Sequence, residues 1–127
     1  MSKGPTGPQY HLQFENFPDH LYVHVSVPEL TEETVVAYIR ETADEVAKRG
    51  CRRVLIVRDI QGTLTDAVNY RISEATVDWF KGIRVAWVNP YPDQIADVQF
   101  FVDVAANRGG SYRLFSDTDT AREWLLR

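Results

Sequence analysis

The sequence has one cysteine, one methionine and no long hydrophobic run. Because Cys51 has no second cysteine to pair with, a disulfide within the chain is impossible, which fits a reducing compartment such as the cytoplasm. No apolar run approaches the roughly 20 residues that a membrane span requires. No signal peptide is visible, and residues 1–9 are rich in glycine and proline, which predicts a disordered tail. We therefore expect a cytoplasmic protein.

The chain also lacks an excess of positively charged residues. The chain has 14 Lys and Arg against 18 Asp and Glu, which gives a net charge of −4. This balance argues against nucleic acid and anionic membrane as main partners, since both require a basic surface. Hydrophobic residues make up 44% of the 127 residues, which is enough for one sizeable core. We expect a single domain over residues 10–127.

The most informative stretch is Arg-Val-Leu-Ile-Val-Arg-Asp at residues 53–59. Its four consecutive apolar residues, three of them β-branched, predict a strand that is covered on both faces. Residues 59–65 then leave this strand and enter a predicted helix. Because ligands and partners of open α/β sheets meet the carboxyl ends of such strands, any site is expected there first.

Two alternating segments, residues 10–15 and 21–27, predict an antiparallel hairpin before this strand. A short loop would place Phe14 opposite Leu21 and His11 opposite His24. Two facing imidazoles could bind a metal, but a zinc site needs three or four ligands. We therefore interpret both histidines as solvated strand residues and predict no metal site.

The rest of the chain alternates helices with strands. Thr31 and Gly50 are the expected cap residues of a first helix, whose buried stripe includes Val35, Ile39 and Val46. The remaining expected elements are a helix from Thr65 to Gly82 with Val68, Ile72, Ala75 and Trp79 on its buried side, a strand at 83–88, a helix from Pro92 or Asp93, a strand at 112–115, and a helix capped by Ser116 or Asp117.

This β-β-α-β-α-β-α-β-α order predicts an α/β fold with a mixed, mainly parallel sheet and right-handed crossovers. Such crossovers would put the helices largely on one face of the sheet. The other face, which carries Tyr22 and His24, would then need a cover. We therefore expect a homo-oligomer such as a homodimer.

Three pieces of the chain resemble one known family. They are Leu21–Val25, then Val54–Val57 with the following Asp59 and Gly62, and finally Phe115-Ser116-Asp117 followed by Ala121, Trp124 and Leu125. In this order they resemble the STAS domain (sulfate transporter and anti-sigma-factor antagonist), and in particular its small standalone SpoIIAA-like branch. That branch is similar to lipid-binding SEC14-type domains. The resemblance implies a STAS-like fold and a non-enzymatic regulatory role.

One position departs from that family. Anti-sigma-factor antagonists of this fold carry Asp-Ser-Ser-Gly after the central strand, and a partner kinase phosphorylates the second serine. The matching residues here run from Asp59 to Gly62, with Gln61 in place of the phosphorylated serine. Gln61 has no hydroxyl group, so that switch cannot operate at this position. Thr63 and Thr65 are the nearest hydroxyl groups, and a phosphate on the first turn of a helix would be favourable.

Several residues have competing interpretations. Asp59 could be a general base or could cap the following turn, and capping is favoured because no histidine is near it in sequence. Arg58 could bind an anion. Cys51 would be nucleophilic only if Arg52 and Arg53 depressed its pKa, and no Cys-His arrangement supports this. Tyr91 lies between two prolines and is a candidate contact residue for a partner.

These observations lead to one main hypothesis and two alternatives. The main hypothesis is a regulatory or protein-interaction module without catalytic residues, metal or cofactor, whose expected partner surface consists of Asp59, Gln61, Gly62, Thr63, Thr65 and Tyr91. One alternative is a small SEC14-like carrier of an apolar or acyl ligand. The other is a hydrolase-type enzyme that uses Asp59 and a histidine, which requires a histidine close to Asp59 in space.

Overall fold

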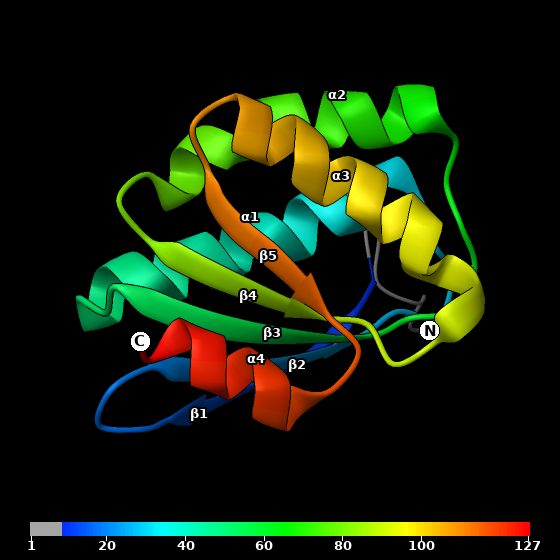
Figure 1. The fold of residues 1–127 in the computed structure, drawn as a ribbon. Helices are drawn as coiled ribbons and strands as arrows, with labels where there is room; N and C mark the ends of the chain where they lie inside the picture. Colours follow the sequence, from blue (N-terminus) through cyan, green and yellow to red (C-terminus); the bar gives the residue numbers. More distant parts are fainter. Residues whose placement is uncertain (1–8) are drawn as a thin grey trace, which may run out of the picture.

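A five-stranded sheet with helices on both faces forms the domain (Figure 1). The structure is a computed structural model that describes residues 9–127, so the predicted tail lies almost entirely outside the described residues. The elements in order are β1 (His11–Asn16), β2 (Leu21–Ser26), α1 (Glu32–Arg49), β3 (Arg53–Asp59), α2 (Asp66–Thr76), η1 (Val77–Phe80), β4 (Arg84–Val88), η2 (Pro92–Gln94), α3 (Ile95–Asn107), β5 (Ser111–Phe115) and α4 (Thr118–Leu125).

The strands lie in the spatial order β1-β2-β3-β4-β5. Only the β1–β2 pair is antiparallel, and the other three pairs are parallel. The predicted element order and the mainly parallel sheet are therefore confirmed. β3 lies in the middle of the sheet, and its four apolar residues, Val54, Leu55, Ile56 and Val57, are all buried as predicted.

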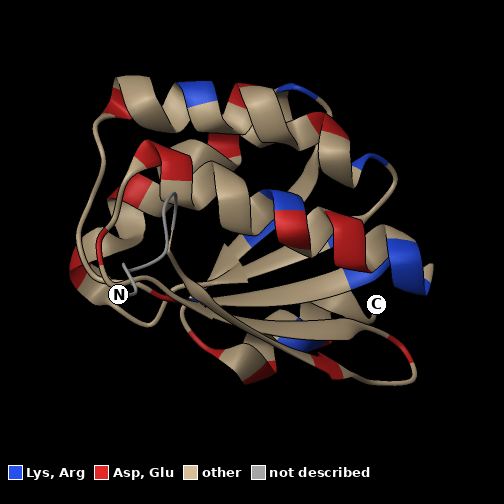
Figure 2. Ribbon diagram, turned by 180° about the vertical axis from the view of Figure 1, so that it is seen from behind, with Lys and Arg blue, Asp and Glu red and all other residues tan. Residues whose placement is uncertain are grey.

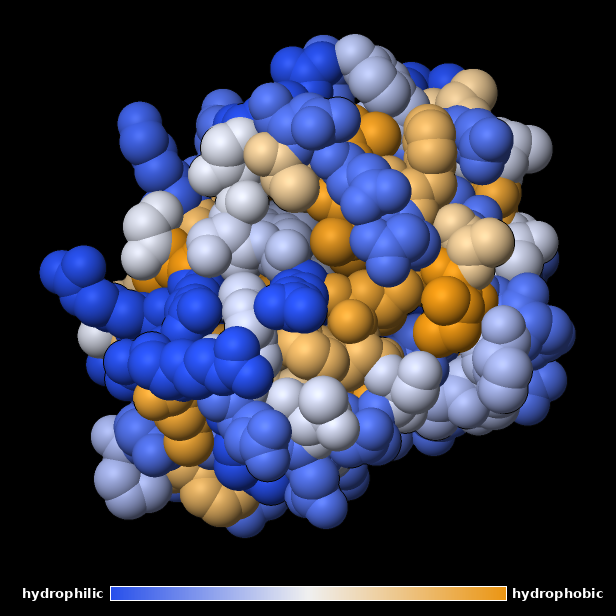
Figure 3. Space-filling model, in the orientation of Figure 1, coloured by the Kyte–Doolittle hydropathy of each residue, from blue (hydrophilic) through white to orange (hydrophobic). Residues whose placement is uncertain are grey.

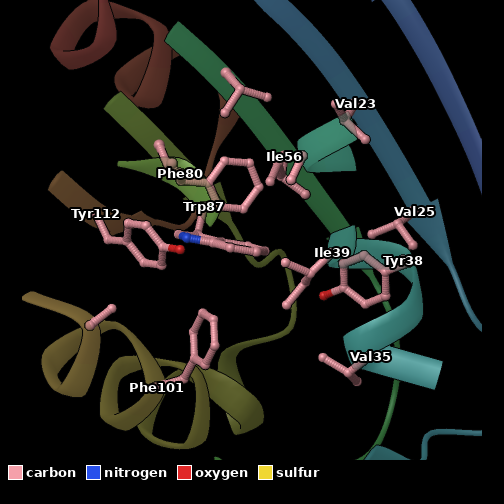
Figure 4. Close-up of a cluster of buried hydrophobic side chains, with 14 of the residues drawn as sticks. Val23, Val25, Val35, Tyr38, Ile39, Ile56, Phe80, Trp87, Phe101 and Tyr112 are labelled. Atoms are coloured by element: carbon pink, nitrogen blue, oxygen red, sulfur yellow. The ribbon is translucent and has the colours of Figure 1, made fainter. Parts of the chain in front are cut away.

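The larger part of the core lies between the sheet and the layer of α1, α2 and α3. Trp87 of β4 is fully buried at its centre, with the ring of Phe101 edge-on at 5.3 Å and the ring of Tyr112 tilted at 5.8 Å (Figure 4). Phe101 comes from α3 and Tyr112 from β5, so Trp87 joins three elements. Edge-to-face aromatic contacts of this kind add about 0.5–1.5 kcal/mol to the effect of burial.

α1 begins and ends as its sequence predicts. The side chain of Thr31 accepts a hydrogen bond from the backbone N–H of Thr34, which satisfies one free donor of the first turn. Gly50 closes the helix with a φ of 66°, a left-handed conformation that costs glycine little.

The buried side of α2 differs from the prediction. Ala75 is exposed, whereas Ser73 and Thr76 are fully buried. The Ser73 hydroxyl donates to the carbonyl of Phe101 at 3.0 Å, and the Thr76 hydroxyl to that of Ile72 at 2.8 Å. These bonds satisfy the hydroxyl groups, so polar residues can line this helix interface. A pattern of periodic apolar residues does not identify such buried positions. The α-helix also ends at Thr76, and a 3₁₀ turn follows it.

The register predicted for the hairpin was wrong. His24 lies opposite Gln13, and His11 lies opposite Ser26. The cause is that β1 extends to Asn16, which pairs with Leu21 and leaves a loop of residues 17–20. The two histidines therefore do not face each other. Among residues 9–127, no three His, Cys, Asp or Glu side chains gather in a way that could hold a metal ion.

The helices lie largely on one face, as expected, because α1, α2 and α3 pack together there (Figure 1). The expectation that the other face lacks a cover was wrong, since α4 packs on it. Its Ala121 and Leu125 are fully buried against Leu55 and Val57 of β3 and against the neighbouring strand β4. The apolar centre of this face is thus covered within the chain, which removes the original reason for expecting a homodimer.

Candidate functional site

A group of polar side chains meets where β2 and β3 end. Nε2 of His24 lies 3.3 Å from Oδ2 of Asp59, and the hydroxyl of Tyr91 donates a hydrogen bond to Oδ1 of Asp59. The side chains of Asp59 and His24 are 42% and 32% exposed, so solvent reaches the group. We refer to His24, Tyr91 and residues 59–65 together as the Asp59 corner.

The hydrogen bonds of Tyr91 change its acidity. The pKa of Tyr91 is raised, first because its hydroxyl hydrogen is bound to the Asp59 carboxylate and also because that carboxylate is negative. A hydrogen bond from the side chain of Gln61 acts in the opposite direction. Asp59, Gln61 and Tyr91, all predicted to belong to one surface, are therefore brought together by these bonds.

Two side chains from the segment after β4, Gln94 and Asp97, form hydrogen bonds with the backbone of the loop at residues 59–65. With its amide nitrogen facing a carbonyl, Gln94 donates to the carbonyl of Ile60 at 2.7 Å, and its oxygen accepts from the N–H of Gly62 at 2.9 Å. Oδ2 of Asp97 accepts from the N–H of Leu64 at 3.4 Å. Because Gln94 and Ile60 are both buried, the bond between them is shielded from water, and the three bonds together fix the backbone of the loop.

The loop turns outward at Gly62. Its φ of 105° is in a region that other residues rarely adopt, and a Cβ there would also contact Leu30 at 3.5 Å. The side chains on either side, Gln61 and Thr63, are exposed. The corner therefore presents a fixed backbone with exposed hydrogen-bonding groups.

Arg58 points to the other side of the sheet from Asp59, toward α1. It is 8% exposed, and its Nε donates to the hydroxyl of Tyr38 at 3.2 Å. No carboxylate among residues 9–127 lies within ion-pair distance of it. Together with Tyr38, Asn69 and Asp97 it lines a cavity of about 20 Å³, which has room for about one water molecule. Arg58 is therefore directed into the protein and is not part of the exposed corner.

The predicted site residues have different environments. Thr63 is exposed at the surface of the loop, whereas Thr65 caps α2, because its Oγ1 accepts from the N–H of Val68 at 3.2 Å. The contacts found for Asp59 join it to Tyr91 and His24 rather than to the following turn, so the preferred capping interpretation was wrong. Cys51 is half-buried, and burial raises the pKa of its thiol, which makes it a poor nucleophile.

The sequence reasoning missed His24, Gln94 and Asp97 as members of this corner. A signal existed for His24: the pairing of Ser26 with Asp59 puts His24 and Asp59 on the same face of neighbouring strands. No comparable signal existed for Gln94 and Asp97. Their contacts depend on how the segment after β4 folds back against the loop.

Comparison with known proteins identifies the fold. No family model and no curated protein matches the sequence. A serine-to-glutamate variant of RsbS from Moorella thermoacetica is 14% identical, with 90% of this chain and 93% of that chain covered and a TM-score of 0.55. An uncharacterized protein of the DUF3478 family from Shewanella loihica PV-4, described as having a SpoIIAA-like fold, is 21% identical, with 98% of each chain covered and a TM-score of 0.51.

The chain has a SpoIIAA-like fold of the STAS type. This confirms the family resemblance at the level of fold, over nearly the whole of the described chain. In addition, none of the helices within residues 9–127 has both the length and the apolar character needed to cross a membrane.

Proposed function

We propose that this protein is a non-enzymatic regulatory or protein-interaction module of the cytoplasm, and that the Asp59 corner contacts its protein partner. The supporting observation is that a solvent-exposed polar group stands on a backbone fixed from below by Gln94 and Asp97. A surface fixed before binding loses little conformational entropy when a partner docks. The likeness to RsbS supports the regulatory class through the fold.

The charge of the corner indicates the kind of partner. Acidic residues are frequent at the end of the molecule where the strands end and the long helices begin (Figure 2). Asp59, Asp66 and Asp93 all lie at this end, and each of the latter two is in the first turn of a helix. A partner surface with lysine or arginine side chains would complement this charge and speed association.

A photo-crosslinking experiment tests this proposal. A photoreactive amino acid at Thr63 should crosslink a protein in the native host, whereas the same group at exposed Lys48, in the last turn of α1, should not. The captured protein is then purified, and its affinity is measured for the original chain and for the Gln61→Ala and Asp103→Asn variants. Weaker binding of Gln61→Ala alone supports the proposal. Equal binding of all three chains contradicts it.

The distance of 3.3 Å between His24 and Asp59 favours a second candidate function. The hydrolase-type hypothesis required a histidine near Asp59, and this requirement is met. A carboxylate beside an imidazole can orient that imidazole as a general base. Hydrolysis of chromogenic ester substrates that disappears in both His24→Ala and Asp59→Asn would support the enzyme and contradict the interaction module.

The carrier hypothesis finds less support at this corner. The enclosed cavity beneath it holds about 20 Å³, whereas sites for small ligands commonly have about 300–1,000 Å³. A carrier would therefore need to open this region to bind an acyl chain. Mass spectrometry of lipids that co-purify with the native protein tests this alternative.

Self-association remains a prediction, and the structure suggests a different surface for it. β5 is an edge strand, and apolar surface gathers between β5 and α3 (Figure 3). An edge strand can pair with the same strand of a second copy. Analytical ultracentrifugation at high concentration tests this prediction, and a Leu114→Lys variant should shift any dimer toward monomer.

A further inference from the structure

A cluster of basic residues lies at the opposite end of the sheet from the Asp59 corner. In the ribbon, lysine and arginine positions occur where the helices end and the parallel strands begin (Figure 2). Arg52 and Arg53 lie at the start of β3, and Arg84 lies at the start of β4. The chain as a whole has a net charge of −4, so this local excess of arginine gives one end of the sheet a charge opposite to that of the whole protein.

The arginines of this cluster differ from those on the helices. Five other arginines each lie within ion-pair distance of a carboxylate: Arg40, Arg49, Arg71 and Arg122 on helices, and Arg108 at the end of α3. Among residues 9–127, no Asp or Glu carboxylate lies within that distance of Arg52, Arg53 or Arg84. The charges of Arg52 and Arg53 are therefore available to an anion from outside.

These three side chains line a surface hollow of about 430 Å³, which we call the arginine pocket. Its other lining residues are Gly82, Ile83 and Ser111. The polar side chains of the pocket are three guanidinium groups and one hydroxyl, so the lining offers several hydrogen-bond donors and no negative charge. Gly82 has no side chain and leaves the backbone open to a close approach.

The sheet holds two of these arginines together. Arg53 and Arg84 are directly opposite each other on neighbouring parallel strands, and like charges in such positions are destabilising. The guanidinium of Arg84 is fixed, because it lies 4.3 Å from the ring centre of Trp124 and donates through Nη1 to the main-chain oxygen of Arg127, the last residue, at 3.2 Å. An anion between the two arginines would relieve their repulsion.

The nearest acidic neighbour does not neutralise the pocket. The pKa of Asp19 is lowered chiefly by its hydrogen bond with His20, and Arg53 is only the smallest of the causes. The distance from Asp19 to His20 is 2.8 Å, whereas no ion pair joins Asp19 to Arg53. Asp19 is therefore already engaged by another side chain.

We propose that the arginine pocket binds the phosphoryl group of a small phosphorylated molecule. Guanidinium groups match the oxygens of a phosphate in pairs, and a dianion would balance the charges of Arg52 and Arg53. A long nucleic acid fits less well, since the pocket is confined to a few residues and the rest of the protein is acidic. This site is independent of the Asp59 corner.

An NMR titration of the full-length protein tests this inference. Inorganic phosphate and ribose 5-phosphate are each added, with sodium chloride of matched ionic strength as a third titrant. Both phosphates should shift the amide signals of Ile83, Arg84 and Ser111 in a saturable way, and chloride should not. Equal affinities would show that the phosphoryl group alone is recognised, and tighter binding of ribose 5-phosphate would show that the sugar also contributes.

Variants connect the binding to the arginines. Arg53→Gln should raise the Kd for phosphate about tenfold or more, because a charge-assisted hydrogen bond is lost. Arg113→Gln removes the same charge outside the pocket and should leave the Kd within about twofold. If Arg53→Gln does not fold, the exposed Arg52 can be changed to glutamine instead. Shifts that follow ionic strength alone, or equal Kd values in the pocket and control variants, would overturn the inference.

Discussion

Asn69 of α2 donates a hydrogen bond to Asp97 of α3 at 2.7 Å, and this contact links the first turns of two helices that flank the Asp59 corner. Asn69 is buried, and its amide also lies 3.4 Å from the carbonyl oxygen of Leu64. One amide group thus connects the loop to both helices. Its removal should affect the loop and the fold together.

Replacement of Asn69 by alanine should lower the free energy of unfolding by about 1–3 kcal/mol, since Asp97 and Leu64 both lose a hydrogen-bond donor in a partly buried place. Urea unfolding monitored by circular dichroism measures this effect. The matched control is Asp103→Ala, which removes an exposed side chain of α3 that is bonded only to Gln99 of the same helix. The interpretation fails if both variants unfold at the same urea concentration.

The contact between Tyr91 and Asp59 should be visible in a pH titration. The raised pKa of Tyr91 means that the folded protein holds this phenolic proton more tightly than the unfolded chain does. The resulting stability is fully present below about pH 10, the usual tyrosine pKa, and is lost as the pH rises through the higher folded value. Tyrosine-labelled carbon NMR follows the titration directly.

In Asp59→Asn, Tyr91 should titrate at a lower pH than in the original protein, because the carboxylate that favours the protonated phenol is gone. Asp103→Asn is the control, since it removes a charge from the exposed side of α3 and should leave the titration of Tyr91 unchanged. An unchanged titration of Tyr91 in the variant would show that the two side chains do not interact in solution.

The attachment of α4 should depend on pH through Asp117. Its carboxylate accepts hydrogen bonds from the backbone N–H and the hydroxyl of Thr120, and these bonds lower the pKa of Asp117. A lowered folded pKa contributes stability above the unfolded value near 3.9, and this contribution is lost as the pH falls through the folded pKa. The urea midpoint of the original protein should therefore exceed that of Asp117→Ala at pH 7, and the difference should shrink toward pH 2.

An Asp117→Asn variant separates the cap from its charge. Asparagine also caps helices well, so this variant should keep most of its stability at pH 7 and show a weaker dependence on acid pH. Asp19 and Glu32, whose pKa values are also lowered, keep their own contributions. An acid dependence equal to that of the original protein would show that Asp117 does not contribute to it.

Much of the fold could be predicted from local patterns. β3 has four consecutive apolar residues because the sheet is covered on both faces, and this run is directly visible in the sequence. The cap residues Thr31, Gly50 and Asp117 could also be predicted, because each caps its helix through contacts with residues only a few positions away. Local chemistry is the part of a fold that a single sequence records best.

Contacts between distant residues were less predictable. The charge of Arg58 predicts an exposed side chain, yet this side chain is buried. Its burial is tolerated because the hydroxyl of Tyr38, 20 residues away, accepts a hydrogen bond from it. The observed register of β1 differs from the predicted one by two residues, and this shift places His24 opposite Gln13 and not opposite His11. Likewise, the position of residues 59–65 after the central strand predicted the Asp59 corner. The contacts of Gln94 and Asp97 with this loop join residues far apart in sequence, and they are visible only in the structure.

A last prediction concerns the hydroxyl of Tyr112 in the aromatic core. This oxygen is buried and has no hydrogen-bond partner among residues 9–127, and burial raises its pKa well above the usual value. Its ring packs against Trp87 and Phe101, and these contacts do not require the hydroxyl. Because a buried polar group without a partner costs free energy, Tyr112→Phe should leave stability unchanged or raise it by about 1 kcal/mol. A loss of more than about 1 kcal/mol in urea unfolding would show that the hydroxyl forms a bond in solution. Tyr38→Phe is the contrasting control, since it removes the acceptor of buried Arg58 and should destabilise the protein.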